Sequence, residues 1–471
     1  MAVPVISVDQ MREWEKSSWA AGKTAADVIQ EVGRKISIRL ASLAHPGDKI
    51  LFLAGRGHNG DDVRAALEQL PEQFVPHLIN VTDPADGREK FLAAVSGGSA
   101  WIVDGLFGIG LDRPLDERWQ ELITTVNDSR VPVVSVDVPS GLNADTGGIE
   151  GAAIVADVTL TVGAAKRGLL KAPKHVGRLE VLPDVGLVPC PFEEELNWTL
   201  EHDFSDLPPR RLVESNKGSY GHLAICAGSS GYHGAAVLAG LGAARAQPGL
   251  ITIFPQESVY VPVASQCQAT MVHAWRVGQP LVKGCSALLF GPGLAGVDVS
   301  DAMKEELQTH WREAQLPVIA DASALDWLPQ GPTQADAVRV ITPHPGEAGR
   351  MLGSSATAVQ SDRVAALRTL SRQFGNCIVV LKGHQTLVGR ASGGIFANCS
   401  GNPSLAQGGS GDLLGGYIAG LLAQPEWQTN PLRTVRFGVW QHGAAADCLS
   451  RGPANWTIED LSRRLGAIIA K

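Results

Sequence analysis

The chain has 471 residues, of which 44 % are hydrophobic and 19 % are charged, and its formal net charge is −8. This composition is typical of a globular protein with two domains and argues against a disordered chain. A net negative charge does not attract nucleic acid, so we expect no nucleic acid among its partners. No apolar stretch is long enough to cross a bilayer, so we expect no membrane partner either.

Seven cysteines are scattered along the chain without a Cys-x-x-Cys pair. This usage is typical of reduced thiols in a cytosol, and it offers no zinc site. The first residues lack the basic and apolar regions of a secretory signal. We therefore expect a cytoplasmic protein.

The first half of the chain alternates between helical and strand patterns. A helix is expected over residues 9–45, followed by a strand at Lys49–Leu53, a glycine-rich loop at 55–62 and a helical run through Leu70. The order strand, glycine loop, helix is typical of nucleotide-binding α/β folds.

Two further strands of this half should end in carboxylates. The predicted strands are 102–104, 134–137 and 158–161, so that Asp104 and Asp137 lie at the sheet edge where such folds bind ligands. Each aspartate would serve equally well to cap a turn. Between about 185 and 215 the chain becomes rich in proline and acidic residues, which indicates an interdomain strap. We therefore predict two α/β domains, 1–195 and 196–471.

The second half repeats the α/β pattern, with polar loops after several strands. Strands are expected at 223–227, 251–254, 287–290, 318–320, 339–341 and 378–381. His344 and Lys382 lie in loops that follow two of them, at the edge where this architecture keeps its site. Taken singly, His344 is typical of a surface histidine and Lys382 of a solvated lysine.

The glycine-rich stretch from Gly401 to Asp412 is where we place the chemistry. Ser410 is a good N-cap for a helix whose apolar residues recur at helical spacing. Asp412 then lies in the first turn, where free N–H groups and the helix dipole favour a phosphate, and where a carboxylate can accept the proton of a hydroxyl. The alternative is that Ser410, Gly411 and Asp412 only begin a helix.

The second half also carries six motifs in a fixed order: Lys217–Gly221, Gly234–Ala236, Gly291–Leu294, Thr342–Glu347, Lys382–Thr386 and Gly401–Asp412. They look like the successive motifs of the ADP-dependent NAD(P)H-hydrate dehydratase. Nearly the whole chain resembles the family of bifunctional NAD(P)H-hydrate repair enzymes, in which an epimerase domain precedes this dehydratase.

The resemblance implies a ribokinase-like domain that uses ADP or ATP with Mg²⁺ to dehydrate the S form of NADH or NADPH hydrate. In the family scheme the ring hydroxyl is phosphorylated and phosphate then leaves, which is easier than loss of hydroxide. By resemblance Asp412 is the catalytic base and also contacts the hydrate, together with Ala235, Gly293 and His344. The nucleotide would be bound by Lys382, Gly383, His384, Gln385, Thr386 and Gly411.

The first half resembles the epimerase, a Rossmann-like domain that interconverts the R and S hydrates, through Val103–Gly110, Val136–Gly141 and Gly163–Gly168. The resemblance implies K⁺ bound by Asn59, Asp104 and Ser140, all oxygen donors suited to a hard cation. Asp137 would be catalytic and face the substrate. The other substrate-binding residues implied are His58, Asn59, Gly60, Asp61, Asp62, Gly108, Ile109, Gly110, Leu111, Asp112, Arg113 and Pro114.

Three departures from the family pattern stand out. Ser410 replaces a threonine and keeps its hydroxyl, whereas Ser323 replaces an aspartate and puts one metal-water or structural contact in doubt. In the glycine loop, Asp61 and Val63 stand where the family has glycines. If those positions need positive φ and face a pyrophosphate, both residues are unfavourable, so we expect weakened epimerase activity.

Two alternatives remain open at this point. The anion site alone would also suit a small-alcohol or vitamin kinase, and the first domain would then be a non-catalytic binding module. We expect a homo-oligomer. The sequence leaves open the preferences between ADP and ATP and between NADH and NADPH hydrates.

Overall fold

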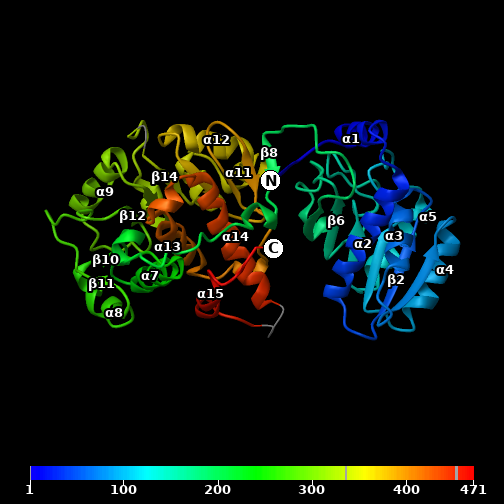
Figure 1. Cartoon of the computed structure of the whole chain (residues 1–471), viewed down its shortest axis with the longest axis horizontal. Coiled ribbons are helices and arrows are strands. Elements are labelled where there is room, and N and C mark those ends of the chain that lie inside the picture. The colour runs from blue at the N-terminus through cyan, green and yellow to red at the C-terminus, as the bar shows by residue number, and fades with distance from the viewer. Residues whose placement is uncertain (1, 335–336, 451–454, 471) are drawn as a thin grey trace. The chain divides into compact units, whose positions relative to one another are not determined.

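Two separate sheets organise the chain, and each has its own helices (Figure 1). The computed structural model describes residues 2–334, 337–450 and 455–470. The chain divides into two units between Glu194 and Glu195, one residue before the predicted boundary. Each unit is an α/β fold with its own hydrophobic core.

The N-terminal unit contains a six-stranded sheet in the order β3-β2-β4-β5-β6-β7, with every neighbouring pair parallel. The strands of the unit are β1 (Val3–Pro4), β2 (Lys49–Ala54), β3 (Val75–Asn80), β4 (Trp101–Gly105), β5 (Val133–Val136), β6 (Val158–Val162) and β7 (Arg178–Leu182). Its helices are α1 (Val8–Ala20), α2 (Ala25–Leu43), α3 (His58–Glu68), α4 (Pro84–Val95), α5 (Glu117–Asp128) and α6 (Pro173–Val176).

Apolar side chains point to both faces of this sheet, and helices cover both faces. Ile50 and Phe52 of β2 pack in one cluster with residues of α2 and α3, whereas Leu51 and Leu53 pack in another with residues of α4 and α5. Successive side chains of a strand point to opposite faces, so β2 contributes to both clusters. The result is the three-layer arrangement of a Rossmann-like fold.

The predicted single helix over residues 9–45 is wrong, because the structure has two helices there. Helix α1 ends at Ala20, and Gly22 adopts φ 85° two residues later. Thr24 then caps α2, its side chain accepting a hydrogen bond from the N–H of Asp27. A glycine such as Gly22 commonly ends a helix, and a threonine such as Thr24 commonly begins the next one.

The C-terminal unit is built on a larger sheet, whose strands follow the order β8-β17-β16-β15-β14-β13-β12-β9-β10-β11. The pairs of β16 with β15 and β17 are antiparallel, and the other neighbouring pairs are parallel. The strands are β8 (Leu196–Trp198), β9 (His222–Cys226), β10 (Leu250–Phe254), β11 (Met271–Val272), β12 (Ala287–Phe290), β13 (Val318–Ala320), β14 (Arg339–Ile341), β15 (Ile378–Leu381), β16 (Leu387–Gly389) and β17 (Ile395–Ala397).

Three helices of this unit, α7, α13 and α14, pack in one core cluster with the central strands. Glycines let α13 approach α7 closely: a Cβ on Gly416 would lie 2.0 Å from the carbonyl oxygen of Ala239. The helices of the unit are α7 (His233–Ala246), α8 (Tyr260–Ala264), α9 (Asp301–Glu313), α10 (Pro345–Met351), α11 (Ala356–Ser361), α12 (Arg363–Gln373), α13 (Ser410–Leu422), α14 (Pro431–Leu449) and α15 (Ile458–Arg464).

The predicted strap over 185–215 is wrong for its middle part. Residues 196–198 form β8, which pairs with β17, and Trp198 is only 1 % exposed. Glu195 forms an ion pair with Arg368 at 2.7 Å. The proline- and acid-rich composition of this stretch concealed a short strand.

We expect a fragment that begins at Glu195 to fold, and one that begins at Glu201 to be much less stable. The second cut removes β8 and the buried Trp198, and loss of a buried tryptophan side chain costs roughly 3–5 kcal/mol. Urea unfolding of both fragments checks this, with Trp198→Ala in the longer fragment as the matched control. Equal unfolding midpoints for the two fragments would contradict it.

Candidate active site

The N-terminus of α13 is arranged differently from the prediction that Ser410 caps it. The N-cap is Gly409, at φ 90°, and Ser410 is the first helical residue, with its hydroxyl oxygen 3.3 Å from Nε2 of the buried His442. A side chain at position 409 would meet both the left-handed backbone and Leu238, whose Cδ1 lies 2.3 Å from an ideal Cβ. Glycine therefore takes the cap position, and no side chain occupies the helix end.

Four backbone N–H groups are left free around this helix start. The amides of Gly408, Gly409, Gly411 and Asp412 donate no hydrogen bond within the described part of the chain. Free amides and the positive end of a helix dipole together form an anion site. The arrangement can hold a phosphate through backbone N–H groups.

Asp412 lies in this first turn and is partly buried. The pKa of its carboxyl group is raised to about 7, mainly by burial and also by the negative charges of Asp321 and Glu347, against the opposing effect of Lys382. A carboxylate with a pKa near neutrality is a good proton acceptor at physiological pH. Asp412 therefore combines the position and the basicity that a catalytic base needs.

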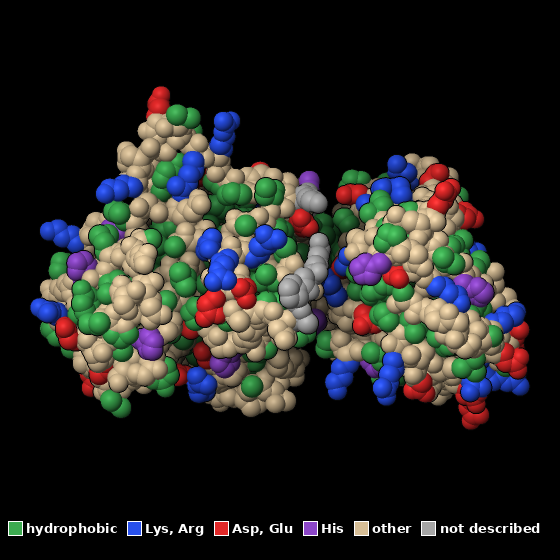
Figure 2. Space-filling model, turned by 90° about the horizontal axis from the view of Figure 1, so that it is seen from below, with side chains coloured by type: hydrophobic (Ala, Val, Ile, Leu, Met, Phe, Trp, Pro, Cys, Tyr) green, Lys and Arg blue, Asp and Glu red, His purple; other side chains and the backbone are tan. Residues whose placement is uncertain are grey.

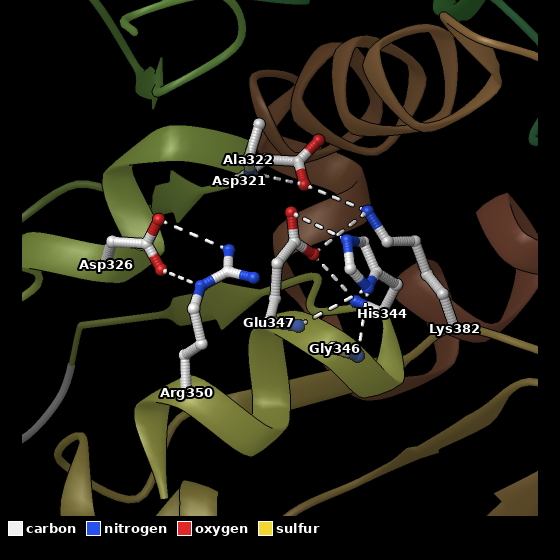
Figure 3. Close-up of polar contacts among 8 residues, drawn as sticks. All are labelled: Asp321, Ala322, Asp326, His344, Gly346, Glu347, Arg350 and Lys382. Atoms are coloured by element: carbon white, nitrogen blue, oxygen red, sulfur yellow. Dashed lines mark hydrogen bonds and ion pairs between the residues drawn. The ribbon is translucent and has the colours of Figure 1, made fainter. Parts of the chain in front are cut away.

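Lys382 lies between the carboxylates of Asp321 and Glu347 (Figure 3). Its ammonium group donates to Oδ1 of Asp321 at 3.2 Å and lies 3.9 Å from Oε2 of Glu347. Burial acts to lower the pKa of Lys382, but Asp321, Glu347 and Asp412 outweigh it, so the pKa lies above its usual value. An ideal Cβ on Gly411 would lie 3.2 Å from Nζ, which places this cation beside the anion site.

Asp321 has an oxygen available for a ligand. It is 1 % exposed and its Oδ1 accepts hydrogen bonds from Lys382 and the N–H of Ala322, whereas Oδ2 has no partner in the described part of the chain. A buried carboxylate oxygen without a partner is costly. A cation bound there would remove that cost.

His344 and Glu347 form a capping box at the start of α10 (Figure 3). The Nδ1 atom of His344 accepts from the N–H groups of Gly346 and Glu347, and Oε2 of Glu347 accepts from the N–H of His344 at 2.7 Å. The His344 side chain is still 52 % exposed. His344 thus caps the helix and presents the rest of its ring to solvent, while Glu347 reaches Lys382.

The predicted nucleotide-binding residues 382–386 form the turn between β15 and β16. Arg363, which the sequence analysis did not single out, holds this turn by donating to the carbonyl oxygens of Leu381, His384 and Gln385. Gly383 and Gln385 adopt φ 136° and 51°. The turn is therefore fixed from behind, and Lys382 joins it to the anion site.

Of the other residues predicted to bind the hydrate, the structure brings Ala235 and Gly293 together. An ideal Cβ on Gly293 would lie 2.9 Å from Cβ of Ala235. No hydrogen bond joins this pair to His344 or Asp412 in the described residues. Ser323, where the family has an aspartate, has no side-chain hydrogen bond in the part of the chain that the structure describes.

In the N-terminal unit, the structure brings three of the predicted substrate residues together near the start of α3. Asn59 and Asp137 both lie close to Gly108, since a Cβ there would be 3.3 Å from Cβ of Asn59 and 3.6 Å from Oδ2 of Asp137. Asp137 adopts φ 62°. Asp112 and Arg113 are exposed and form no ion pair within the described ranges.

The residues predicted to bind K⁺ are also neighbours. Ser140 donates to Oδ1 of the fully buried Asp104 at 2.6 Å, and Asn59 donates through Nδ2 to the carbonyl oxygen of Phe107. Oδ1 of Asn59 is buried and has no partner among the residues described. The oxygens of Asp104 already accept four hydrogen bonds, from Leu106, Ser135 and Ser140. Asn59 is therefore the member of this set with an oxygen open to a cation.

The geometric objection to Asp61 and Val63 is wrong. Both lie inside α3, and neither has a positive φ. The Asp61 carboxylate pairs with Arg64 at 2.8 Å, and Val63 is fully buried against Gly105. The sequence predicted a glycine loop here, but helix α3 begins at His58. The surroundings of Asp61 and Val63 are therefore those of helical residues.

Lys166 is the functional candidate that the sequence analysis did not single out in this unit. Its ammonium group is fully buried and donates to Oδ1 of Asp137 at 2.6 Å. Burial raises the pKa of Asp62 well above its usual range, and the negative charges of Asp137, Asp61 and Glu15 act in the same direction. The site therefore combines one buried cation with several carboxylates.

The sheet order of the C-terminal unit, the anion site at α13 and the buried carboxylates beside it define a nucleotide-dependent enzyme of the ribokinase-like class. A solved structure supports this: the ADP/ATP-dependent NAD(P)H-hydrate dehydratase of Bacillus subtilis, co-crystallised with ATP and Mg²⁺, is 31 % identical with a TM-score of 0.51 and covers 57 % of this chain and 96 % of its own.

The family model described as NAD(P)H-hydrate dehydratase matches residues 223–470, and the model of the YjeF-related protein N-terminus matches residues 79–168. Bifunctional NAD(P)H-hydrate repair enzymes of Coxiella burnetii and Escherichia coli are 35 % and 32 % identical to this chain. These matches cover 93 % and 98 % of this chain, and 93 % of each relative. The chain belongs to the family of bifunctional NAD(P)H-hydrate repair enzymes.

Proposed function

We propose that this protein restores hydrated nicotinamide nucleotides, with a C-terminal dehydratase that uses ADP or ATP and an N-terminal epimerase that interconverts the R and S hydrates. The observation that carries the first activity is the set of free amides at α13 with Asp412 among them. A kinase of small alcohols shares such an anion site, but the family to which the chain belongs favours the dehydratase.

In the dehydratase, Asp412 accepts the proton of the ring hydroxyl while the hydroxyl oxygen bonds to the terminal phosphorus of the nucleotide, whose bond to the bridging oxygen breaks and releases the shortened nucleotide. The carbon–oxygen bond of the resulting phosphate ester then breaks and the neighbouring ring carbon loses a proton to the solvent, which forms the ring double bond. Phosphate leaves far more readily than hydroxide. The free amides of the α13 N-terminus and Lys382 hold the negative charge of the transferred group. The turn at 382–386 binds the nucleotide, and Ala235, Gly293 and His344 line the hydrate site.

Mg²⁺ fits this site as a partner of the nucleotide phosphates. The described residues contain no cluster of three or more ligating side chains, and Mg²⁺ commonly uses one or two carboxylates together with phosphates. Asp321 would hold it through its unpartnered Oδ2, with Glu347 nearby. When bound, Mg²⁺ neutralises phosphate charge during transfer.

In the epimerase, Asp137 faces the substrate and Lys166 holds it in place through a buried ion pair. K⁺ would be held by Asn59, Asp104 and Ser140, and the unpartnered Oδ1 of Asn59 supports this set. The geometric reason for expecting weak epimerase activity no longer holds. Asp61 lies in a helix, where it forms an ion pair with Arg64, and it does not stand in a left-handed turn.

The partners we propose are NADH and NADPH hydrates and ADP, in a cytoplasmic homo-oligomer. No helix in the described residues is long and apolar enough to cross a bilayer. On the face shown in Figure 2, basic and acidic side chains are interspersed. All seven cysteines are free, which suits a reducing compartment.

The deciding experiment incubates the separated R and S hydrates with the protein and follows the absorbance of regenerated NADH. We expect the S hydrate to be converted only when ADP or ATP is present with Mg²⁺. We expect the R hydrate to be converted faster than its spontaneous epimerisation allows, and more slowly when Na⁺ replaces K⁺. Conversion of neither form would contradict the proposal.

The rate of dehydration should depend on pH through Asp412. A base works in its deprotonated form, and the pKa of Asp412 is about 7, so kcat/KM for the S hydrate should rise roughly tenfold per pH unit below 7 and level off above it. Initial rates between pH 5 and 9 test this. A profile that is flat through pH 7 would show that Asp412 is not the base.

A further inference from the structure

We propose that Asp447 of α14 is a positioning residue for the dehydratase, because it fixes the loop that leads into the free amides of α13. This inference rests on the proposed function of that site. The residues involved are Trp440, His442, Gly443 and Asp447 of α14, which we call the α14 clasp, and the loop 400–410 that they contact.

The carboxylate of Asp447 binds the start of the loop with both of its oxygens. The N–H of Gly401 donates to Oδ2 at 2.9 Å, and Nδ2 of Asn402 donates to Oδ1 at 3.1 Å. Gly401 has φ 105°, and Oδ1 of Asn402 in turn accepts from the N–H of Ser404. The Asp447 side chain therefore holds both the backbone of the loop at Gly401 and the side chain of Asn402.

The helix touches the loop closely at a second point. The hydroxyl of Ser400 donates to the carbonyl oxygen of Trp440 at 2.8 Å. One turn along, Gly443 leaves no room for a side chain, since a Cβ there would lie 2.4 Å from the hydroxyl oxygen of Ser400 and 2.6 Å from its carbonyl carbon. At the far end of the loop, Ser410 contacts His442. The loop is thus held by α14 at both ends.

The position of Asp447 is unfavourable for α14 itself. It lies in the last turn of a helix that ends at Leu449, where the negative end of the helix dipole repels a carboxylate. Aspartate is also a weak helix former. The two hydrogen bonds from the loop help to offset this cost.

Fixing this loop matters because the anion site is made of backbone. The amides of Gly408, Gly409, Gly411 and Asp412 bind phosphate well only if they already point in the required direction, since a loose loop must be ordered on binding. A displacement of about 1 Å in such a site commonly costs on the order of a hundredfold in rate. Loss of the clasp should therefore affect phosphate binding and transfer together.

The test exchanges the amide and the carboxylate across the contact. In Asp447→Asn the new amide group faces the amide group of Asn402, so two donors meet. In Asn402→Asp the new carboxylate faces that of Asp447, so two negative charges meet. Each single variant should therefore lose roughly ten- to hundredfold in kcat/KM for the S hydrate. In the double variant, the new amide at position 447 accepts from the N–H of Gly401 and donates to the new carboxylate at position 402. Its kcat/KM should therefore return to within about threefold of the wild-type value, because both contacts are restored.

Three further measurements separate positioning from general stability and from the proposed function. Val435→Ala, at a fully buried position of the same helix, is the matched control, and it should lower the melting temperature while leaving kcat unchanged. Hydrogen exchange of the amides of 401–409 should speed up in the single variants and slow again in the double variant. The affinity for ADP should likewise fall in the single variants and recover in the double variant. ADP binding can be measured even if the wild-type protein shows no turnover.

The outcomes are distinct. A wild-type protein that binds ADP but does not dehydrate the S hydrate contradicts the proposed function alone. Single variants with unchanged ADP affinity and unchanged hydrogen exchange in 401–409 overturn the inference about Asp447. A folded double variant that recovers neither also overturns it.

Discussion

Replacement of Asp412 by asparagine is expected to abolish nucleotide-dependent dehydration while nucleotide binding survives. The backbone amides of the α13 N-terminus remain after the change, so the phosphate site persists. The proton acceptor does not remain, and such a loss commonly costs several kcal/mol in barrier height, roughly a thousandfold or more in rate. Turnover of the S hydrate and calorimetric ADP binding measure the two effects.

Asp326→Asn is the matched control, since it removes a neighbouring carboxylate that pairs with the exposed Arg350 (Figure 3). We expect this control to keep near-normal turnover. Asp412→Asn should also lose ADP affinity by no more than a fewfold, because removal of a negative charge beside the phosphates does not weaken their binding. Near-normal turnover of Asp412→Asn would exclude Asp412 as the base.

The second large effect is expected in the N-terminal unit, where Asp61→Gly combined with Val63→Gly should destabilise the unit without raising epimerase activity. Val63 is fully buried, and loss of its side chain costs about 1.5–3 kcal/mol in burial. Glycine inside a helix costs roughly 1 kcal/mol more at each position. We therefore expect a loss of roughly 3–5 kcal/mol in the free energy of unfolding of the unit, measured by urea titration.

The single change Asp61→Gly separates the two positions. It removes an exposed ion pair with Arg64, which contributes little, so about 1 kcal/mol should be lost through the helix alone. Conversion of the R hydrate, compared with the spontaneous rate, measures epimerisation for both variants. If the double variant were stable and faster than the wild type, the assignment of these residues to α3 would be wrong.

Local patterns in the sequence were enough for the class of fold. Short apolar runs predicted the strands at 287–290, 318–320, 339–341 and 378–381 with the bounds that the structure has. The short strands β8, β16 and β17 were not predicted, because three residues are too few to show a strand pattern in the sequence. The motif order from Lys217 to Asp412 led to the family, which the comparisons confirm.

Residue types at short spacing were enough to predict the α/β fold class, the family and the glycine-rich start of α13. Contacts between residues far apart in the chain depend on the fold: Lys382 reaches Asp321, and Asp447 holds Gly401. These pairs are separated by 61 and 46 residues, and which side chains meet depends on strand order and helix packing. Burial, which is the main reason that the pKa of Asp412 is raised to about 7, is likewise a property of the packed molecule and not of any short segment.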